Sequence, residues 1–393
     1  MTKLPQGWEV KKLGEIFNIE RGGSPRPIKE FLTDKEDGIN WIKIGDIKNQ
    51  KYLYATEEKI IQEGLKKSKL VIEGDLLVSN SMSFGKPVIV KLQKGAIHDG
   101  WLLLKEKINL NKEYFYYLFS SNFMYDFLSY QASGSTVKNL NIDKLKQIEI
   151  PLPPLQEQER IVGILDESFA KIDESIKILE QDLLNLDELI QSALQKAFNP
   201  LKDNTKENYK LPQGWEKFNF DNIFYSPSSK NYQLNTKDYL EKGCIPIIDQ
   251  SKKFIIGYSN NYEKVFKINN CNNSCIIFGD HTRVLKFIDF DFIVGADGVK
   301  ILLNKDIERF NTKFLFFQLL YKDIPLLGYR RHFSVLKQNT FSIPPLKEQE
   351  QIASHLDELS SHVKNLKQNY QMQIKNLQEL KKSLLDKAFQ GRL

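Results

Sequence analysis

A long amphipathic segment occurs twice in this chain, and the two copies match without a gap. The first copy runs from Pro153 to Pro200, and the second runs from Pro344 to Leu393, 191 residues further along the chain. Surface loops tolerate insertions, whereas one residue added to a helix rotates everything beyond it by about 100°. The constant length therefore indicates a helical spacer whose length matters.

Apolar residues in both copies recur at alternating steps of three and four, which is typical of the seam of a coiled coil. The first copy carries Ile161, Leu165, Ile172, Leu179, Leu183, Leu186, Ile190, Ala193 and Ala197, and the second carries Ile352, Leu356, Val363, Tyr370, Ile374, Leu377, Lys381, Leu384 and Ala388. The seam is imperfect, because Lys381 replaces Ile190 and Ser168 interrupts the first copy.

Each copy follows prolines, which suit a helix start, and the copies end before Asn199-Pro200 and before Gly391. About 44 residues give a helix of roughly 65 Å. Such a helix cannot bury its apolar stripe alone, so we expect the two copies to pack antiparallel on each other. The alternative is two unrelated core helices, each packed on its own domain.

The composition is that of an ordinary globular protein, with 41% hydrophobic residues. No apolar run approaches the roughly 18 residues that a membrane span needs, and the first ten residues lack the apolar core of a signal peptide. Three cysteines in 393 residues argue against a disulfide framework. We therefore expect a cytoplasmic location and no membrane partner.

The charge is unevenly distributed along the chain. Residues 1–150 carry 23 basic and 19 acidic side chains, and residues 201–343 carry 21 and 15. The first helical copy, residues 151–200, carries only 4 basic and 10 acidic side chains. Basic globular segments suit a polyanion, whereas an acidic helix is better suited to contact a protein than to lie along phosphates.

The globular segments repeat as well. The letters LPQGWE occur at Leu4–Glu9 and again at Leu211–Glu216, and Asp99-Gly100 resembles Asp297-Gly298. The offset shrinks from 207 to 198 and then to 191 at the helices, so the second globular segment has shorter loops on the same arrangement of elements. Runs rich in β-branched and aromatic residues predict strands. These runs are Ile39–Ile44, Asp75–Ser79, Pro87–Leu92, Ile245–Ile248, Cys275–Phe278 and Val284–Ile288.

The order along the chain is thus globular, helical, globular, helical. We place the first globular domain at residues 1–152, the first spacer helix at 153–199, a linker and the second globular domain at 200–343, and the second spacer helix at 344–393. The linker is the polar stretch Leu201–Tyr209.

Three sets of motifs recur in this order and spacing. LPQGW precedes each globular segment, PPLQEQ and PPLKEQ open the helical copies, and ALQKAF and LLDKAF close them. Together they resemble the specificity subunit of type I restriction-modification systems, over essentially the whole chain. The resemblance implies an α+β fold with two mixed α/β target-recognition domains. Two long antiparallel coiled-coil helices with internal pseudo-twofold symmetry join these domains.

The resemblance also implies a function. Each target-recognition domain reads one half of a split, asymmetric sequence in double-stranded DNA, and the helices set the unread gap between the halves. Two modification subunits dock on the helices and domains and methylate adenine N6, and restriction subunits add translocation and cleavage. S-adenosylmethionine, ATP and magnesium are then expected on the partner subunits, with no cofactor and no catalytic residue in this chain.

Motifs of catalysis are missing from the sequence. It contains no G-x-x-x-x-G-K-[ST] phosphate loop, no G-x-G-x-x-G and no H-E-x-x-H. It also lacks an Asn or Asp followed by Pro-Pro and an aromatic residue, the motif that adenine methyltransferases use. Asp99 and Asp297 could appear catalytic, but each is followed by glycine, and a turn before a strand explains them better.

Cysteines and histidine in the second globular segment raise the question of a metal. Cys271, Cys275 and His281 could supply three zinc ligands, with Cys244 as a fourth. The C-x3-C spacing is uncommon in structural zinc sites, and the first globular segment has no counterpart. We therefore expect reduced, partly buried thiols and no metal.

Polar loops in both globular segments carry the residue types that contact phosphates and base edges. In the first segment the candidate DNA-binding residues are Arg21, Arg26, Lys43, Lys48, Ser79, Asn80, Ser81, Ser83, Lys86, Ser135, Thr136, Lys138 and Asn139. In the second they are Ser229, Lys230, Gln250, Lys252, His281, Thr282, Arg283, Arg330, Arg331, His332 and Ser334. For any one loop the alternative is a solvated turn, and the Arg330-Arg331 pair is the strongest candidate.

An ungapped offset of 198 pairs Ser79–Lys86 with Ile277–Val284, and equivalent positions with different residues are what two half-site readers require. Two other functions compete with DNA recognition. A self-sufficient nuclease or methyltransferase is disfavoured by the missing motifs. A coiled-coil scaffold whose globular ends bind proteins is disfavoured by the charge distribution, and salt-dependent binding to duplex DNA would discriminate between it and a DNA reader.

Overall fold

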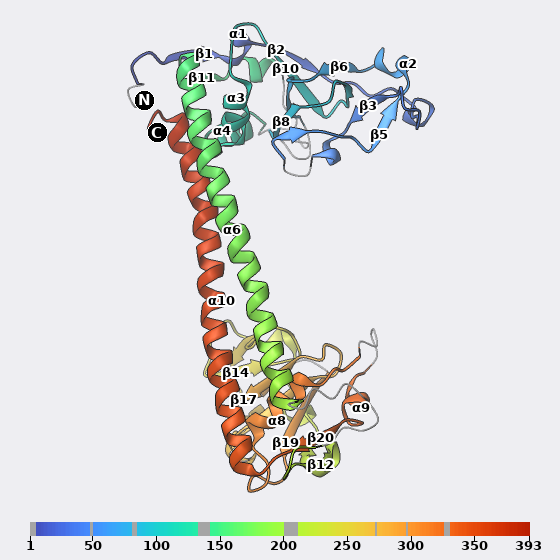
Figure 1. Cartoon of the computed structure of the whole chain (residues 1–393), viewed down its shortest axis with the longest axis vertical. Helices are drawn as coiled ribbons and strands as arrows, with labels where there is room; N and C mark the ends of the chain where they lie inside the picture. Colours follow the sequence, from blue (N-terminus) through green and yellow to red (C-terminus); the bar gives the residue numbers. More distant parts are fainter. Residues whose placement is uncertain are drawn as a thin grey trace. The chain divides into compact units, whose positions relative to one another are not determined.

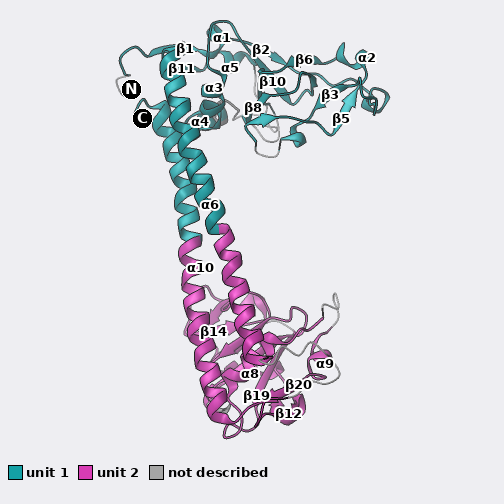
Figure 2. Cartoon of the chain, in the orientation of Figure 1, with its two compact units in different colours: residues 1–179, 371–393 teal, residues 180–370 magenta. Residues whose placement is uncertain are grey.

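The computed structural model describes residues 5–47, 50–80, 85–132, 142–199, 211–271, 273–295, 298–325 and 331–393. The chain forms two compact units (Figure 2). Unit 1 comprises Met1–Leu179 and Gln371–Leu393, and unit 2 comprises Glu180–Tyr370. Each unit therefore combines one globular segment with a part of each long helix. No helix in the described ranges combines the length and the apolar character that crossing a bilayer requires.

The described residues of unit 1 form five short α-helices and eleven strands, most of which are labelled in Figure 1. The helices are α1 Leu13–Ile16, α2 Gln62–Leu65, α3 Lys112–Ser120, α4 Asn122–Ala132 and α5 Ile142–Lys146. The strands are β1 Glu9–Lys12, β2 Phe17–Arg21, β3 Ile39–Ile42, β4 Tyr52–Leu53, β5 Glu58–Ile60, β6 Lys69–Ile72, β7 Leu76–Ser79, β8 Pro87–Val90, β9 Lys94–Ile97, β10 Trp101–Glu106 and β11 Glu149–Leu152.

Unit 2 repeats this arrangement with fewer elements among its described residues. Its short helices are α7 Phe220–Ile223, α8 Thr312–Tyr321 and α9 Phe333–Leu336. Its strands are β12 Glu216–Asn219, β13 Phe224–Tyr225, β14 Ile245–Ile248, β15 Gly257–Ser259, β16 Cys275–Gly279, β17 Leu285–Ile288, β18 Ile293–Val294, β19 Val299–Asn304 and β20 Thr340–Ile343. All six strands expected from the sequence are present, and their ends agree within two residues.

The sheets of the two units share one topology. The main sheet has the order β2-β10-β7-β8-β4 in unit 1 and β13-β19-β16-β17 in unit 2. A second sheet has the order β5-β3-β9-β6 in unit 1 and β15-β14-β18 in unit 2, and its β3·β9 and β14·β18 pairs are parallel. A two-stranded pair, β1-β11 or β12-β20, leads into the long helix of each unit. The repeat seen in the sequence is thus a repeat of the fold, which confirms the α+β class.

The two long helices are α6 Leu155–Phe198 and α10 Leu346–Phe389, and each contains 44 residues. In unit 1 the start of α6 shares a core with the end of α10, through Leu165 and Phe389. In unit 2 the end of α6 shares a core with the start of α10, through Leu194 and Leu356. The helices are therefore antiparallel, as expected, and every predicted seam position is buried or half-buried.

The irregular seam position Lys381 has a structural explanation within unit 1. Its ammonium lies 2.7 and 2.8 Å from the two carboxylate oxygens of Asp173 and 4.7 Å from the ring centre of Phe169. The long aliphatic stem of a lysine can cover apolar surface while its charged end reaches a partner. Lys381 can thus replace an apolar seam residue without leaving a charge unpaired.

The QGW motif forms a turn before the first strand of each unit. Trp8 N–H donates to Pro5 O (3.2 Å), and Trp215 N–H donates to Pro212 O (3.1 Å). The glycine between them has φ +84° in unit 1 and +85° in unit 2. A left-handed φ at the third position of a turn favours glycine, which explains the shared motif.

The glutamine that ends PPLQEQ is buried and fixes the start of α6. Gln158 is 2% exposed. Its Oε1 accepts a hydrogen bond from Asn111 N–H (2.9 Å), and its Nε2 donates to Pro153 O (2.9 Å). The Asn111 side chain in turn caps α3 by accepting from the backbone N–H groups of Glu113 and Tyr114. One buried amide therefore joins the long helix to the globular part of unit 1.

The equivalent glutamine of PPLKEQ makes the same contacts in unit 2, with one addition. Gln349 is fully buried. Its Oε1 accepts from Asn311 N–H (2.8 Å), and its Nε2 donates to Pro344 O (2.8 Å) and to Arg309 O (2.9 Å). Asn311 caps α8 by accepting from Phe314 N–H. The glutamine that PPLQEQ and PPLKEQ share thus marks the same junction between globular part and long helix in both units.

Candidate nucleic-acid interface

In unit 2 the fold brings together loops that are far apart in the sequence. The segment after β14 meets the turn between β16 and β17, because His281 N–H donates to Gln250 Oε1 (3.1 Å) and Thr282 Oγ1 donates to Gln250 O (2.6 Å). The segment before α9 meets the same turn, because His332 N–H donates to Asp280 O (2.8 Å). The described parts of three segments that carry predicted DNA-binding residues, around Gln250, His281 and His332, therefore adjoin one another and form one surface.

Asp280 is the centre of this surface, although it is only 2% exposed. Its carboxylate accepts from Phe333 N–H (2.8 Å) and lies 3.9 Å from Lys300 Nζ. Its backbone oxygen lies 2.9 Å from His332 Nδ1. A buried carboxylate that is satisfied in this way holds neighbouring loops together. Asp280 thus fixes the start of α9, which carries Ser334 and directly follows Arg331, against the turn that carries His281 and Thr282.

Most of the predicted residues of unit 2 reach the surface. Lys230, Lys252, His281, Thr282, Arg331 and Ser334 are exposed, and Ser229, Gln250 and Arg283 are half-buried. Ser229 Oγ donates to Val299 O (3.1 Å), which places it beside the start of β19, close to Gly298. Arg283 Nη1 donates to Ile324 O (2.5 Å). Cations and amides on a rigid base are the chemistry that phosphates and base edges require.

Unit 1 has a comparable centre at a different position, Asp99, whereas the residue equivalent to Asp280 is Asn80. Ser24 Oγ donates to its carboxylate (2.9 Å), Arg21 Nε donates to its backbone oxygen (3.1 Å), and His98 Nε2 lies 2.9 Å from the carboxylate. Arg26 Nη2 lies 3.8 Å from the same carboxylate, with its side chain 83% exposed. Asp99 therefore orders the loop from Arg21 to Arg26 and leaves the Arg26 guanidinium accessible.

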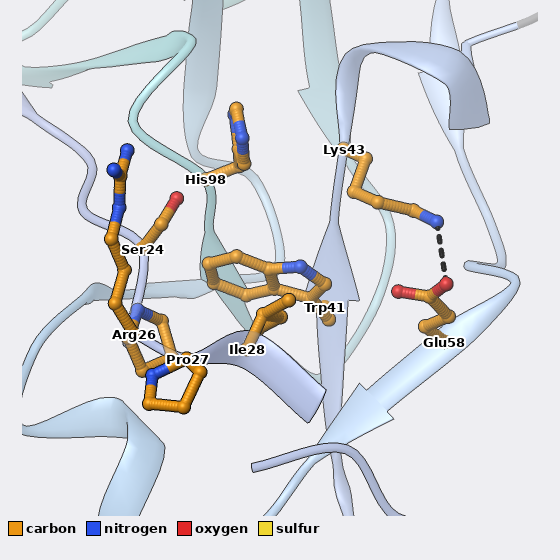
Figure 3. A pocket seen from close by; sticks show the side chains of 9 residues that line it. Ser24, Arg26, Pro27, Ile28, Trp41, Lys43, Glu58 and His98 are labelled. Atoms are coloured by element: carbon orange, nitrogen blue, oxygen red, sulfur yellow. Dashed lines mark ion pairs between the residues drawn. The ribbon is translucent and has the colours of Figure 1, made fainter. Parts of the chain in front are cut away.

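This loop forms one wall of a pocket of about 730 Å³. Trp41 lies at its base between Arg26 and Lys43, and Lys43 pairs with Glu58 at 3.0 Å (Figure 3). The ring of His98 meets the Trp41 ring edge to face, with 5.9 Å between the ring centres. Trp41 is only 1% exposed, so the accessible polar part of the pocket is its rim, where Arg26 and Lys43 supply the cations that phosphate groups of DNA require.

The turns between the central strands of the two main sheets are equivalent. Ser79 N–H donates to Lys86 O (2.9 Å) and Asn80 N–H donates to Gly100 O (2.6 Å) in unit 1. In unit 2, Gly279 N–H donates to Val284 O (2.8 Å) and Asp280 N–H donates to Gly298 O (2.7 Å). The offset is therefore 200 where the turn begins and 198 where it ends. The ungapped pairing at 198 is wrong at the start of the turn, because the turn of unit 2 is two residues shorter.

The comparisons with known proteins agree with this repeated architecture. The family model described as "Type I restriction modification DNA specificity domain" matches residues 5–183 and 212–376. The chain belongs to the type I restriction-modification DNA specificity family. Its role is therefore recognition of a DNA target rather than catalysis, as the resemblance in the sequence implied.

Named relatives agree with this family membership, and solved structures share the fold. The chain is 29% identical to the type I restriction enzyme MjaIX specificity subunit of Methanocaldococcus jannaschii, over 63% of this chain and 58% of that protein. It is 25% identical to the putative MjaX specificity subunit of the same organism, over 100% of this chain and 95% of that protein. A chain in a solved structure of a type I R-M system shares its fold at 20% identity, with a TM-score of 0.76 and full coverage of both chains. The HsdS subunit from Thermoanaerobacter tengcongensis has a TM-score of 0.60 at 20% identity, covering 100% of this chain and 98% of that one.

Three candidate DNA-binding residues of this specificity family member lie in the interior. Ser79, Asn80 and His332 are each 0% exposed. Ser79 accepts from Lys86 N–H through its Oγ (2.9 Å), and His332 is bonded to Asp280 as described. The structure therefore favours a role in loop geometry for these side chains over direct contact with DNA.

The other candidates of unit 1 divide between the surface and the undescribed residues. Arg21, Arg26 and Lys86 are exposed, and Lys43 is half-buried. The remaining candidates of the chain lie outside the described residues, and they are Lys48, Ser81, Ser83, Ser135, Thr136, Lys138, Asn139 and Arg330. Of the strongest sequence candidate, the Arg330-Arg331 pair, the structure thus describes only Arg331, which is exposed.

The thiols expected to be reduced differ in environment. Cys244 is exposed and Cys275 is buried in β16. Within the described residues no three His, Cys, Asp or Glu side chains lie close enough together to hold a metal ion.

Sequence analysis missed two residues that organise the recognition surface of unit 2. Asp280 lies next to the predicted residues His281 and Thr282 but was not itself among the predicted DNA-binding residues. Lys286 lies inside the predicted strand Val284–Ile288 and was not among the predicted DNA-binding residues. The sequence signal for Lys286 is that it lies between Leu285 and Phe287 in β17, whereas the equivalent strand of unit 1, β8, contains only apolar residues.

Proposed function

We propose that each unit reads one half of a bipartite, asymmetric sequence in double-stranded DNA, and that α6 and α10 set the number of unread base pairs between the halves. Two modification subunits dock on the helices and place an adenine-N6 methyltransferase at each half, and restriction subunits join the same assembly. S-adenosylmethionine, ATP and magnesium belong to those partners in this proposal.

The observation that carries the proposal is that equivalent positions of one repeated fold hold different side chains. Ile44 lies against Gly100 in unit 1, and Gln250 lies against Gly298 in unit 2, at the same place after the equivalent strands β3 and β14. A methyl-bearing side chain and an amide prefer different base edges, since apolar groups contact the thymine methyl and glutamine pairs with adenine. Two half-sites of different sequence follow from such differences.

Docking of protein partners on the helices is supported by side chains that the antiparallel pair leaves uncovered. Within unit 1, Ile178 of α6 is 56% exposed and Met372 of α10 is 57% exposed. A groove in the same part of unit 1 is lined by Ser175, Ile178, Leu179, Gln373, Asn376 and Leu377. Exposed apolar residues along a surface mark sites for protein contact, and the acidic character of α6 disfavours DNA there.

The test is to express the chain with its modification subunit in a host without adenine methylation and to sequence the methylated genome. The expected result is a motif of two short, unlike half-sites with a fixed gap, methylated on both strands. Assembly of the complex without any methylated motif would contradict the proposal.

The spacing role has its own test, a matched deletion of one heptad from each helix. Removing residues 178–184 and 369–375 preserves the seven-residue phase of the seam and shortens each helix by about 10 Å. We expect both half-sites to remain and the gap to shrink by about three base pairs at 3.4 Å per step. A matched deletion of four residues from each helix is the control, because it shifts the apolar seam out of its seven-residue phase. An unchanged gap in an active seven-residue variant would exclude the helices as the spacer.

A further inference from the structure

A charged side chain occupies the core of unit 2 at a position that is apolar in unit 1. Lys286 lies in β17 opposite Ile277 of β16, and it is only 3% exposed. The equivalent residue is Val88 of β8, which lies opposite Leu77 of β7 and is 0% exposed. The pair of strands therefore forms equally well with valine at this position, so the sheet itself does not require a lysine.

The ammonium of Lys286 is used entirely by one loop. Its Nζ donates to the backbone oxygens of Asp249 (2.8 Å), Lys253 (2.6 Å) and Phe254 (3.3 Å), and it lies 3.6 Å from the Asp249 carboxylate. A lysine ammonium has three donors, and three carbonyl groups accept from it here. Burial lowers the pKa of Lys286, and the neighbouring Asp249 carboxylate opposes that shift.

The loop that Lys286 closes runs from Asp249 to Phe254 and carries two predicted DNA-binding residues, Gln250 and Lys252. Within it, Asp249 Oδ1 accepts from Ser251 N–H (2.8 Å) and Ser251 Oγ (2.6 Å). Gln250 at its start bonds to His281 and Thr282 of the β16–β17 turn. The bonds from Lys286 therefore determine where the amide of Gln250 and the exposed Lys252 lie relative to that turn.

Burying an ammonium group costs free energy unless its hydrogen bonds are fully replaced. A lysine at this position is thus explained by the loop that it orders. We infer that Lys286 is a positioning residue for the half-site that unit 2 reads. It fixes the loop Asp249–Phe254 from below and does not itself contact DNA. This inference rests on the proposed function, since it assigns Lys286 to one of the two half-sites.

The experiment uses the full specificity–modification complex carrying Lys286→Met, which keeps the length of the side chain and removes its donors. We expect the complex to assemble and the unit 1 half-site and the gap to stay the same. Methylation should lose discrimination at the unit 2 half-site by at least about tenfold at one or more base pairs. Hydrogen exchange should rise in residues 249–254 and remain unchanged in β16.

Two further variants keep the test decisive. Lys237→Met removes an exposed lysine of the same unit and should leave both half-sites as they are. If Lys286→Met does not fold, Lys286→Gln retains two donors without the charge, and Lys286→Val copies the residue of unit 1. An unchanged motif in a folded Lys286 variant, or equal loss at both half-sites, would overturn the inference. Absence of a bipartite motif with the wild-type chain would instead overturn the proposed function.

Discussion

The turn between β7 and β8 in unit 1 and the turn between β16 and β17 in unit 2 have the same backbone bonds and different side chains. Gly85 N–H donates to Ser79 O (2.9 Å), and Arg283 N–H donates to Gly279 O (2.8 Å). Both residues have a positive φ, +77° for Gly85 and +62° for Arg283. An arginine rarely adopts a positive φ, whereas glycine does so without strain. Unit 2 therefore has a strained arginine at the position where unit 1 has a glycine. The repeated backbone permits recognition to vary at such positions.

The junctions with the long helices show the opposite behaviour. Gln158 and Gln349 occupy the same place and make the same bonds to an asparagine cap and to the proline before the helix. The comparison therefore separates positions that build the shared architecture from positions that distinguish the half-sites. It predicts that a change at a junction acts on stability in both units, whereas a change in a loop acts on one half-site.

The largest effect is expected for the junction glutamines. Replacing Gln349 with Leu leaves three buried backbone groups unpaired and should lower the free energy of unfolding of unit 2 by about 3 kcal/mol. Gln158→Leu removes only two such bonds and should lower the free energy of unfolding of unit 1 by about 2 kcal/mol. The difference follows from the additional bond to Arg309 O. Urea unfolding by pulse proteolysis, with peptides assigned to each unit by mass spectrometry, measures both.

Gln156→Leu is the matched control for these variants, because Gln156 belongs to the same motif and is exposed. It should change the unfolding free energy by less than about 0.5 kcal/mol. Equal losses for Gln156→Leu and Gln158→Leu would show that the buried bonds are not what stabilises the junction.

The shared architecture was largely predictable from the sequence, because it depends on local and repeated patterns. The seam steps, the prolines before each helix and the helix ends set α6 and α10 correctly. The aromatic runs Glu113–Phe119 and Lys313–Leu320 occur at matching places in the two globular segments and predict a helix in each, and the helices α3 and α8 form there. Strands of two or three residues, such as β4 and β18, were not predicted, since they exist only through pairing with distant strands.

The recognition surfaces were predictable only as loops. Which side chain faces outward depends on contacts between segments far apart in the chain, as between His332 and Asp280 or between Lys286 and Phe254. No periodicity records these contacts. The sequence also gave no sign that the β16–β17 turn is two residues shorter than the β7–β8 turn. The offset between the units is 198 where this turn ends, and only the hydrogen bonds show that it is 200 where the turn begins.

An intermediate effect is expected from alkaline pH, and it should distinguish the two units. Burial raises the pKa of Tyr114 and of Tyr117 in α3 above the ordinary value for tyrosine. The equivalent residues of α8 are Phe314 and Phe317. In the unfolded chain these tyrosines release their protons near pH 10, whereas in the folded unit they keep them. Their contribution to stability is therefore fully present below pH 10 and is lost as the pH rises above it.

Unit 1 should consequently lose stability between pH 9 and pH 10 by about 1 kcal/mol more than unit 2. Pulse proteolysis at a series of pH values measures this difference. Tyr114→Phe copies the residue of unit 2 and should reduce the difference while the stability at pH 8 changes little, because its hydroxyl makes one long bond, to Pro151 O (3.3 Å). Parallel loss in both units would indicate that titration of lysines dominates instead.

The smallest effect on stability, with a clear effect on recognition, is expected for Arg283→Gly. Glycine removes the strain of a left-handed arginine, worth about 1 kcal/mol, and it also removes the bond from Nη1 to Ile324 O, worth a similar amount. These two terms oppose each other, so the unfolding free energy should change by less than about 1 kcal/mol. Recognition has no such compensation, because the guanidinium is lost from the edge of the surface that carries His281 and Thr282. The methylated motif should therefore lose specificity at the unit 2 half-site alone. The matched variant in unit 1 is Gly85→Ala, whose added Cβ would lie 3.0 Å from Leu128 Cδ1. It should lower the free energy of unfolding by about 1 kcal/mol and leave the motif unchanged. If Arg283→Gly leaves the motif intact, the arginine is retained for the loop bond alone, and the difference between the two turns is one of structure rather than of recognition.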